Sequence, residues 1–114
     1  MRLKAEIWVK AYLRLCQVND IAGFVIKRGD ADAGSILIRV NRLDGRSILF
    51  VPAPASLDDD RGGHRFAART GLEGQSDDEV DQMIERTLSF DPDLWVVETE
   101  DRQGRHLLDD ALKT

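Results

Sequence analysis

The chain has 114 residues, of which 42% are hydrophobic and 32% are charged. This length fits one domain with a real core, and this composition is that of a soluble globular protein rather than of a disordered chain. No apolar run approaches the ~20 residues of a membrane span, and the first residues carry charges throughout, unlike a secretory signal. We therefore expect a single cytoplasmic domain over residues 1–114.

The cysteine count and the charge narrow the classes of function further. The single Cys16 excludes an internal disulfide and any zinc site built from cysteines. The net charge of −5 argues against binding to nucleic-acid phosphates. Residues 1–50 carry nine Lys/Arg and five Asp/Glu (+4), whereas residues 51–114 carry seven and sixteen (−9). This asymmetry is typical of solvated faces, and it can also steer self-association.

The N-terminal segment fits two patterns. Apolar residues alternate from Leu3 to Leu15, as in a strand, but this strand would be far longer than the usual ~5–6 residues. On a helical wheel the apolar residues form one face, the charged residues lie opposite, and most of the residue types are good helix formers. We predict a helix over residues 5–19, with Cys16 as an inert thiol on its apolar face.

Three strand candidates follow, at residues 22–27, 35–40 and 47–51, each with β-branched or aromatic content. The second and third are separated by a segment that contains Asp44-Gly45, a strong hairpin signal. The third ends at Pro52, because proline has no amide to donate to a neighbouring strand. Together the three runs predict an antiparallel meander.

Residues 55–75 are the least structured region of the sequence. They hold the acidic run Asp58-Asp59-Asp60, a pair of glycines and few large apolar residues. Loops of this length are often functional or disordered in compact domains. We expect a flexible loop here, with a short strand near residues 64–68.

The C-terminal part contains clear start and stop signals. Ser76 is expected to cap a helix whose first turn is acidic, and Asp91-Pro92 ends that helix. Residues 94–99 are the most strand-like run of the chain. Residues 105–108 are expected to pair back as a final short strand, before a frayed tail at 109–114.

These elements predict an α+β domain. Nothing in their order demands a parallel sheet, so the simplest architecture is one mostly antiparallel sheet of about five strands with two helices packed on one face. The alternation of residues 35–40 is imperfect because Leu37 points with the polar positions. This irregularity indicates that both faces of that strand are partly covered.

The stretch RGDADAGS, residues 28–35, has two interpretations. As a binding site, Arg28 could hold an anion, and Asp30 with Asp32 could hold a cation. As a turn, its two glycines would supply the positive φ values of a hairpin loop, where aspartate is also favoured. The turn is the preferred interpretation, and Arg28, Asp30 and Asp32 are candidate ligand-binding residues.

His64 is the fourth candidate for ligand binding. It follows the acidic run at 58–60 by four to six residues. Histidine and carboxylates can bind a divalent metal or act as acid and base, but this spacing matches no ligand signature. A solvated loop is therefore the preferred interpretation, and we predict no metal or cofactor. The sequence contains no nucleophile elbow, P-loop or dinucleotide fingerprint, so no catalytic residue is assigned.

Three segments together carry a family resemblance: RLKAEIWVKAYLRLC, KRGDADAGSILIRVNRLDG and FDPDLWVVETEDRQGRHLLD. Over nearly its full length, the chain resembles the alphaproteobacterial family called domain of unknown function 1491. The resemblance implies a short single-domain bacterial cytoplasmic protein. It carries over no catalytic residues.

Two classes of function stay open. The leading hypothesis is a non-catalytic binding or protein-interaction module, which could act as a homodimer. It rests on the lack of a recognisable set of catalytic residues and on the unpaired edge strands expected of a small open sheet. The alternative is a small metal-assisted hydrolase that uses the 58–64 loop, including His64, with Asp30 or Asp32. The expected partner is a second copy or another protein, and neither nucleic acid nor membrane.

Overall fold

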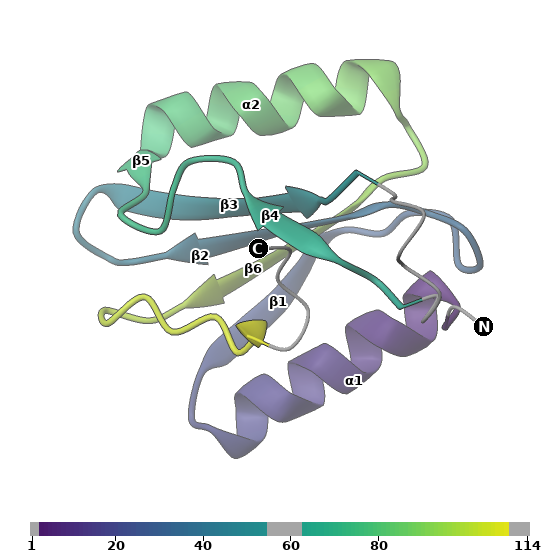
Figure 1. Cartoon of the computed structure of the whole chain (residues 1–114), viewed down its shortest axis with the longest axis horizontal. Helices are drawn as coiled ribbons and strands as arrows, with labels where there is room; N and C mark the ends of the chain where they lie inside the picture. Colours follow the sequence, from purple (N-terminus) through teal and green to yellow (C-terminus); the bar gives the residue numbers. More distant parts are fainter. Residues whose placement is uncertain (1–2, 55–62, 110–114) are drawn as a thin grey trace.

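The computed structural model describes residues 3–54 and 63–109 of the chain (Figure 1). One sheet lies between two helices, which appear on opposite sides of it (Figure 1). The elements in chain order are α1 (Ala5–Val18), β1 (Ala22–Lys27), β2 (Ile36–Asn41), β3 (Arg46–Pro52), β4 (Phe66–Ala68), β5 (Gln75–Ser76), α2 (Asp77–Phe90) and β6 (Trp95–Glu100). Both predicted helices and the predicted strands from β1 to β4 and at β6 are confirmed within about one or two residues at each end.

The sheet confirms the predicted α+β class. Its strand order is β1-β6-β2-β3-β4, and the two-residue β5 also pairs with β3. The β2–β6 pair is parallel, whereas the pairs β1–β6, β2–β3, β3–β4 and β3–β5 are antiparallel. The sheet is therefore mostly antiparallel, as predicted, and it has six strands where about five were expected.

The predicted meander is only half right. The β2–β3 hairpin is confirmed, with Asn41 opposite Ser47 and a φ of 88° at Gly45 in the turn. The predicted hairpin between β1 and β2 is wrong, because β6 lies between them. Trp95 and Val96 of β6 are at most 3% exposed although they point to opposite faces. A strand that is apolar on both faces is stable in the centre of the sheet, so β1 takes the edge.

The predicted placement of both helices on one face is also wrong. α1 packs in a core with Ile38 and Phe50, whereas α2 packs in a separate core with Leu37 and Leu49. Neighbouring residues of a strand point to opposite faces, so the two cores lie on the two sides of the sheet. Because β2 and β3 are apolar at both sets of positions, each face needs its own helix. The irregular position of Leu37 was the sequence signal for this arrangement.

Helix α2 begins at its predicted cap. The Ser76 hydroxyl accepts a hydrogen bond from the Glu79 amide at 3.3 Å and donates one to the Glu79 carboxylate at 2.9 Å. The first turn is acidic, which suits the positive end of the helix dipole. This local pattern is readable from sequence because all of its partners lie within one turn.

The segment after β6 packs on the α1 face and does not form the predicted strand at 105–108. The Tyr12 hydroxyl of α1 donates to the His106 carbonyl oxygen at 2.8 Å, and Leu108 is buried in the α1 core. Residues 110–114 of the predicted tail at 109–114, and residues 55–62 of the predicted loop, lie outside the described residues. Within the described part of that loop, β4 confirms the expected short strand.

The RGDADAGS segment crosses from β1 to β2 past the start of β6. The Asp30 amide donates to the Asp93 carbonyl oxygen at 2.9 Å, and Trp95 Nε1 donates to the Asp30 carbonyl oxygen at 2.7 Å. The Trp95 amide in turn donates to the Ser35 carbonyl oxygen at 2.8 Å. The crossing segment is therefore hydrogen-bonded to β6 at both of its ends.

The same segment also fixes the start of α1. The amides of Ala5 and Glu6 donate to the carbonyl oxygens of Asp32 and Ala31 at 3.1 and 2.9 Å. The first amides of a helix have no partner inside the helix, and α1 has no side-chain cap. Backbone carbonyls of the crossing segment therefore serve as the N-terminal cap of α1.

The two glycines of this segment are required by close packing. The prediction that they supply positive φ values is wrong, since neither has a φ in the left-handed region. A Cβ atom on Gly29 would lie 2.2 Å from the Asp93 carbonyl oxygen, and one on Gly34 would lie 2.6 Å from the same atom. Both contacts are with backbone, which cannot turn aside as a side chain would.

We expect Gly29→Ala to lower the free energy of unfolding by about 2–4 kcal/mol, because the new methyl group must displace the backbone before β6. Gly63→Ala is the matched control, since a Cβ there meets nothing within 4 Å. Chemical denaturation of both variants measures the difference. Equal losses in the two variants would contradict this packing account.

Candidate functional site

Arg28 lies beside the start of α1. Its Nη2 forms an ion pair with Glu6 Oε2 at 2.9 Å, and its guanidinium carbon lies 5.2 Å from the centre of the Trp95 ring. Both contacts connect the crossing segment to neighbouring elements. The predicted anion-binding side chain is thus paired with a carboxylate of its own chain.

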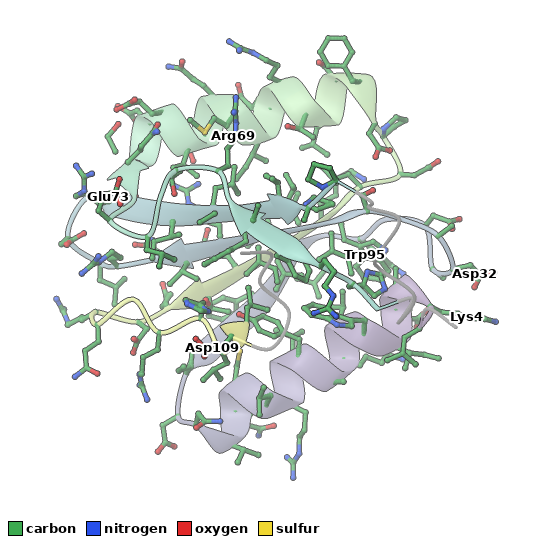
Figure 2. All side chains as sticks on the ribbon, viewed as in Figure 1. Lys4, Asp32, Arg69, Glu73, Trp95 and Asp109 are labelled. Atoms are coloured by element: carbon green, nitrogen blue, oxygen red, sulfur yellow. The ribbon has the colours of Figure 1, made fainter. Side chains whose placement is uncertain are left out.

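Asp30 and Asp32 have separate roles in the same segment. The Asp30 carboxylate accepts hydrogen bonds from the amides of Asp32 and Ala33 at 3.2 and 2.8 Å, which closes a local turn. The Asp32 side chain is 72% exposed and lies 3.8 Å from Lys4 Nζ. Figure 2 shows Asp32 and Lys4 at the periphery of the molecule, beyond the start of α1.

His64 is buried rather than solvated, so the predicted loop environment is wrong for this residue. It is 7% exposed, and its Nε2 donates to the Leu3 carbonyl oxygen at 2.9 Å. Its ring lies 5.6 Å from the ring of Trp8 on α1. The residues before α1 and those before β4 are held together by these contacts.

All four predicted site residues thus lie around the first turn of α1, where each has a structural partner. Within residues 3–54 and 63–109, no three His, Cys, Asp or Glu side chains gather closely enough to hold a metal ion. The acidic run at 58–60 lies outside the described residues. Ligand binding by Arg28, Asp30, Asp32 and His64 stays a prediction.

A different polar cluster lies on the α2 face of the sheet, around Arg39 of β2. This arginine is 8% exposed. Its Nε donates to Ser47 Oγ at 3.1 Å, its Nη2 donates to the Asp77 carbonyl oxygen at 3.2 Å, and its Nη1 forms an ion pair with Asp81. Ser47 Oγ also donates to Asp77 Oδ1 at 2.7 Å. The cluster ties the start of α2 to the two central strands beneath it.

Carboxylates outnumber the single guanidinium in this cluster. Arg39 faces Asp77 and Asp81 of α2 and Glu98 of β6, whose Oε1 lies 3.8 Å from Arg39 Nε. Burial raises the pKa of Glu98 above its ordinary value, and the nearby Arg39 opposes this rise only in part. The three carboxylates and one guanidinium leave an excess of negative charge on this face when all are ionised.

A groove runs beside the cluster, with a volume of about 240 Å³. Its floor is formed by β6 and β2, one wall by α2 and the other wall by β1. We call it the acidic groove, and its lining residues are Ile26, Arg39, Asp81, Ile84, Glu85, Val96 and Glu98. The aliphatic residues give it an apolar surface on which a few charged groups converge, as is typical of binding sites.

The strand that borders the groove is unusually apolar for a sheet edge. Phe24, Val25 and Ile26 of β1 are 46%, 43% and 59% exposed. Phe24 is paired with Glu98 in the β1–β6 register, so it points to the α2 face. We use the name open face for Phe24 together with the acidic groove, to which Ile26 belongs. The open face combines exposed apolar side chains with an acidic lining.

A second groove, of about 480 Å³, lies on the other side of β1 against α1. Its charged lining residues are Lys10 and Arg14, and Phe24 of the edge strand borders this groove as well. Lys10 Nζ is already paired with Glu6 at 3.1 Å, and Arg14 donates to Gln17. The uneven charge of the sequence is therefore also uneven in space. A groove with basic lining residues and a groove with acidic lining residues lie on the two sides of the edge strand β1.

The site on the α2 face was missed by sequence reasoning. Arg39 has the pattern of an outward-facing strand residue, and Asp77 suits a helix start without any further role. Their contacts join residues that are far apart in the sequence. The one available signal was a charged residue inside the apolar run of residues 35–40, where a buried charge requires partners.

Comparisons with known proteins point to one family. Residues 3–109 match the family model described as protein of unknown function (DUF1491). The crystal structure of a DUF1491 family protein from Caulobacter crescentus CB15 has 32% identity and a TM-score of 0.80, with 100% of both chains covered. The solution structure of protein Atu0922 from A. tumefaciens has 40% identity and a TM-score of 0.76, covering 88% of this chain and 86% of that one.

Two further findings concern the curated proteins and the helices. No curated protein matches this chain. In the described part of the chain, neither helix is long and apolar enough to cross a membrane. The similarity to solved structures shows the fold and the family.

Glu98 should make stability depend on pH. Because its folded-state pKa is raised, ionisation of Glu98 costs stability as pH rises through the carboxyl range, and this cost is absent below that range. We expect the free energy of unfolding of Glu98→Gln, relative to that of the wild type, to increase from about pH 3.5 to about pH 7. Chemical denaturation at both pH values tests this expectation. The expectation would be contradicted if the difference in free energy of unfolding between variant and wild type were the same at both pH values, or if it shifted toward the wild type at the higher pH.

Proposed function

The chain belongs to the DUF1491 family, and we propose that it works as a non-catalytic protein-interaction module in the bacterial cytoplasm. One observation carries this proposal, namely the open face. Exposed apolar patches that border polar groups are typical of interaction surfaces. Phe24, an exposed aromatic residue next to the acidic groove, also suits a binding hot spot.

Burial of the exposed side chains of β1 would favour a partner that covers this strand. Phe24 and Ile26 each keep about half of their side-chain surface in water. Burial of the exposed part of such a side chain contributes on the order of 1 kcal/mol. These two contributions favour contact at β1, and the charged groups of the groove add to them.

Photocrosslinking in the cells that make the protein tests the proposal. A photoreactive residue in place of Phe24 or Ile26 should give one discrete crosslinked product with a protein that mass spectrometry identifies. The same residue in place of Leu72, which is 53% exposed in the turn before β5, is the matched control and should not give that product. Crosslinking that is equal at all three positions would overturn the proposal.

Rebinding with purified components completes the test. Ile26→Ser should weaken binding of the identified partner by about fivefold, which corresponds to about 1 kcal/mol. Leu72→Ser should leave the affinity unchanged, since that side chain lies outside the open face. If the crosslinked protein is a second copy of this chain, the module is a homodimer. Light scattering should then show a dimer that Ile26→Ser dissociates.

A further inference from the structure

We infer that the open face binds an amphipathic helix of another protein, which places apolar side chains on β1 and basic side chains over the acidic groove. This inference rests on the proposed function and adds the chemistry of the partner to it. Three features of the structure carry it: the width of the uncovered surface, the shape of the β1 edge, and the charge of the groove.

The uncovered surface has the width of one helix. A helix with its side chains is about 10–12 Å across, and strands are spaced by about 4.8 Å, so one helix covers about two strands. Helix α2 lies over β3 and β2, and its apolar side reaches Val96 of β6. This leaves Phe24 and Ile26 of β1 exposed beside α2, with the partly exposed Glu98 of β6 next to them. A second helix beside α2 would complete the layer.

The edge of β1 is less suited to an added strand. A bulge interrupts its register between Val25 and Lys27. Lys27 Nζ also donates to the carbonyl oxygens of Pro92 and Leu94 at 2.7 and 3.2 Å, which fixes this end of the strand against the segment before β6. Bulges and lysines at sheet edges hinder pairing with further strands. A partner is therefore expected on the face of β1 rather than along its edge.

The groove favours basic side chains. Asp81 and Glu85 are one turn apart on α2 and both line it, and Glu98 lies on its floor. The one cation in the lining, Arg39, is already engaged by Asp77, Asp81 and Ser47. Lysine and arginine of a partner could lay their aliphatic stems on the apolar wall and bring their charges to these carboxylates.

A second copy of this chain does not supply such a helix in a closed dimer. Its α2 is acidic in the first turn and at Asp81 and Glu85, so it would meet like charges in the groove. Its α1 carries Lys10 and Arg14 but lies on the opposite face of the sheet. A contact of α1 with the groove would therefore be head-to-tail and would build a ring or an open filament instead of a two-fold dimer.

Two helical peptides test the inference directly. One carries a leucine stripe flanked by lysines, and the other has the same stripe flanked by glutamates, each about 15 residues long. Fluorescence anisotropy should show saturable binding of the lysine peptide to the wild-type protein and none of the glutamate peptide. Binding of both peptides with equal affinity, or of neither, would overturn the inference.

Charge-reversal variants separate the groove from the overall charge. Glu85→Lys and Glu73→Lys each change the net charge from −5 to −3, but only Glu85 lines the groove. Both side chains are exposed, so both variants should fold, which circular dichroism checks. We expect Glu85→Lys to weaken binding of the lysine peptide at least about tenfold and Glu73→Lys less than about threefold. If both variants weakened binding of the lysine peptide equally, overall charge would explain the effect and the inference would be overturned.

The outcomes of the two sets of experiments are distinguishable. A partner crosslinked at Phe24 and Ile26 that the lysine peptide does not displace would refute the basic-helix chemistry and leave the interaction module standing. Peptide binding in the groove without any crosslinked partner in cells would refute the module. Rings or filaments of this chain that Glu85→Lys dissociates would refute a separate partner in favour of α1 of a second copy.

Discussion

The insertion of β6 between β1 and β2 is the constraint on which the rest of the structure depends. Because β6 is apolar on both faces, it is stable only where both faces are covered, and its position moves β1 to the edge. The segment from β1 to β2 must then pass the start of β6, where Gly29 and Gly34 allow close approach and backbone carbonyls cap α1. A strand pairing thus determines the edge strand, the crossing segment and the anchoring of the first helix.

The same constraint connects the fold to the candidate site. Arg39 fixes the start of α2 over β2 and β3, because leaving this buried guanidinium without its carboxylates would cost several kcal/mol. With α2 held there and β1 at the far edge, one face of the sheet has a single helix at one side. The open face follows from these two positions, and its acidic lining follows from the excess of carboxylates around Arg39.

Sequence reasoning succeeded where the determining contacts are local. The cap of α2 at Ser76 and the turn at Gly45 involve partners a few residues apart, and the single-face pattern of α1 is periodic. The strand order and the side of the sheet on which each helix packs were predicted wrongly. Both depend on β6, a buried strand near the C-terminus that takes the position between β1 and β2. The site was missed for the same reason, since Arg39 meets carboxylates from α2 and β6, which are remote in the sequence.

The central claim is that the exposed side of β1, with the acidic groove beside it, is the surface through which this family member makes contact with its partner. Methyl NMR of isoleucine-labelled protein, titrated with the partner identified in cells, measures this most directly. The account predicts that the resonances of Ile26 and Ile84 shift while that of Ile7, which is exposed on α1, stays in place. Shifts at Ile7 with unchanged resonances of Ile26 and Ile84 would contradict it.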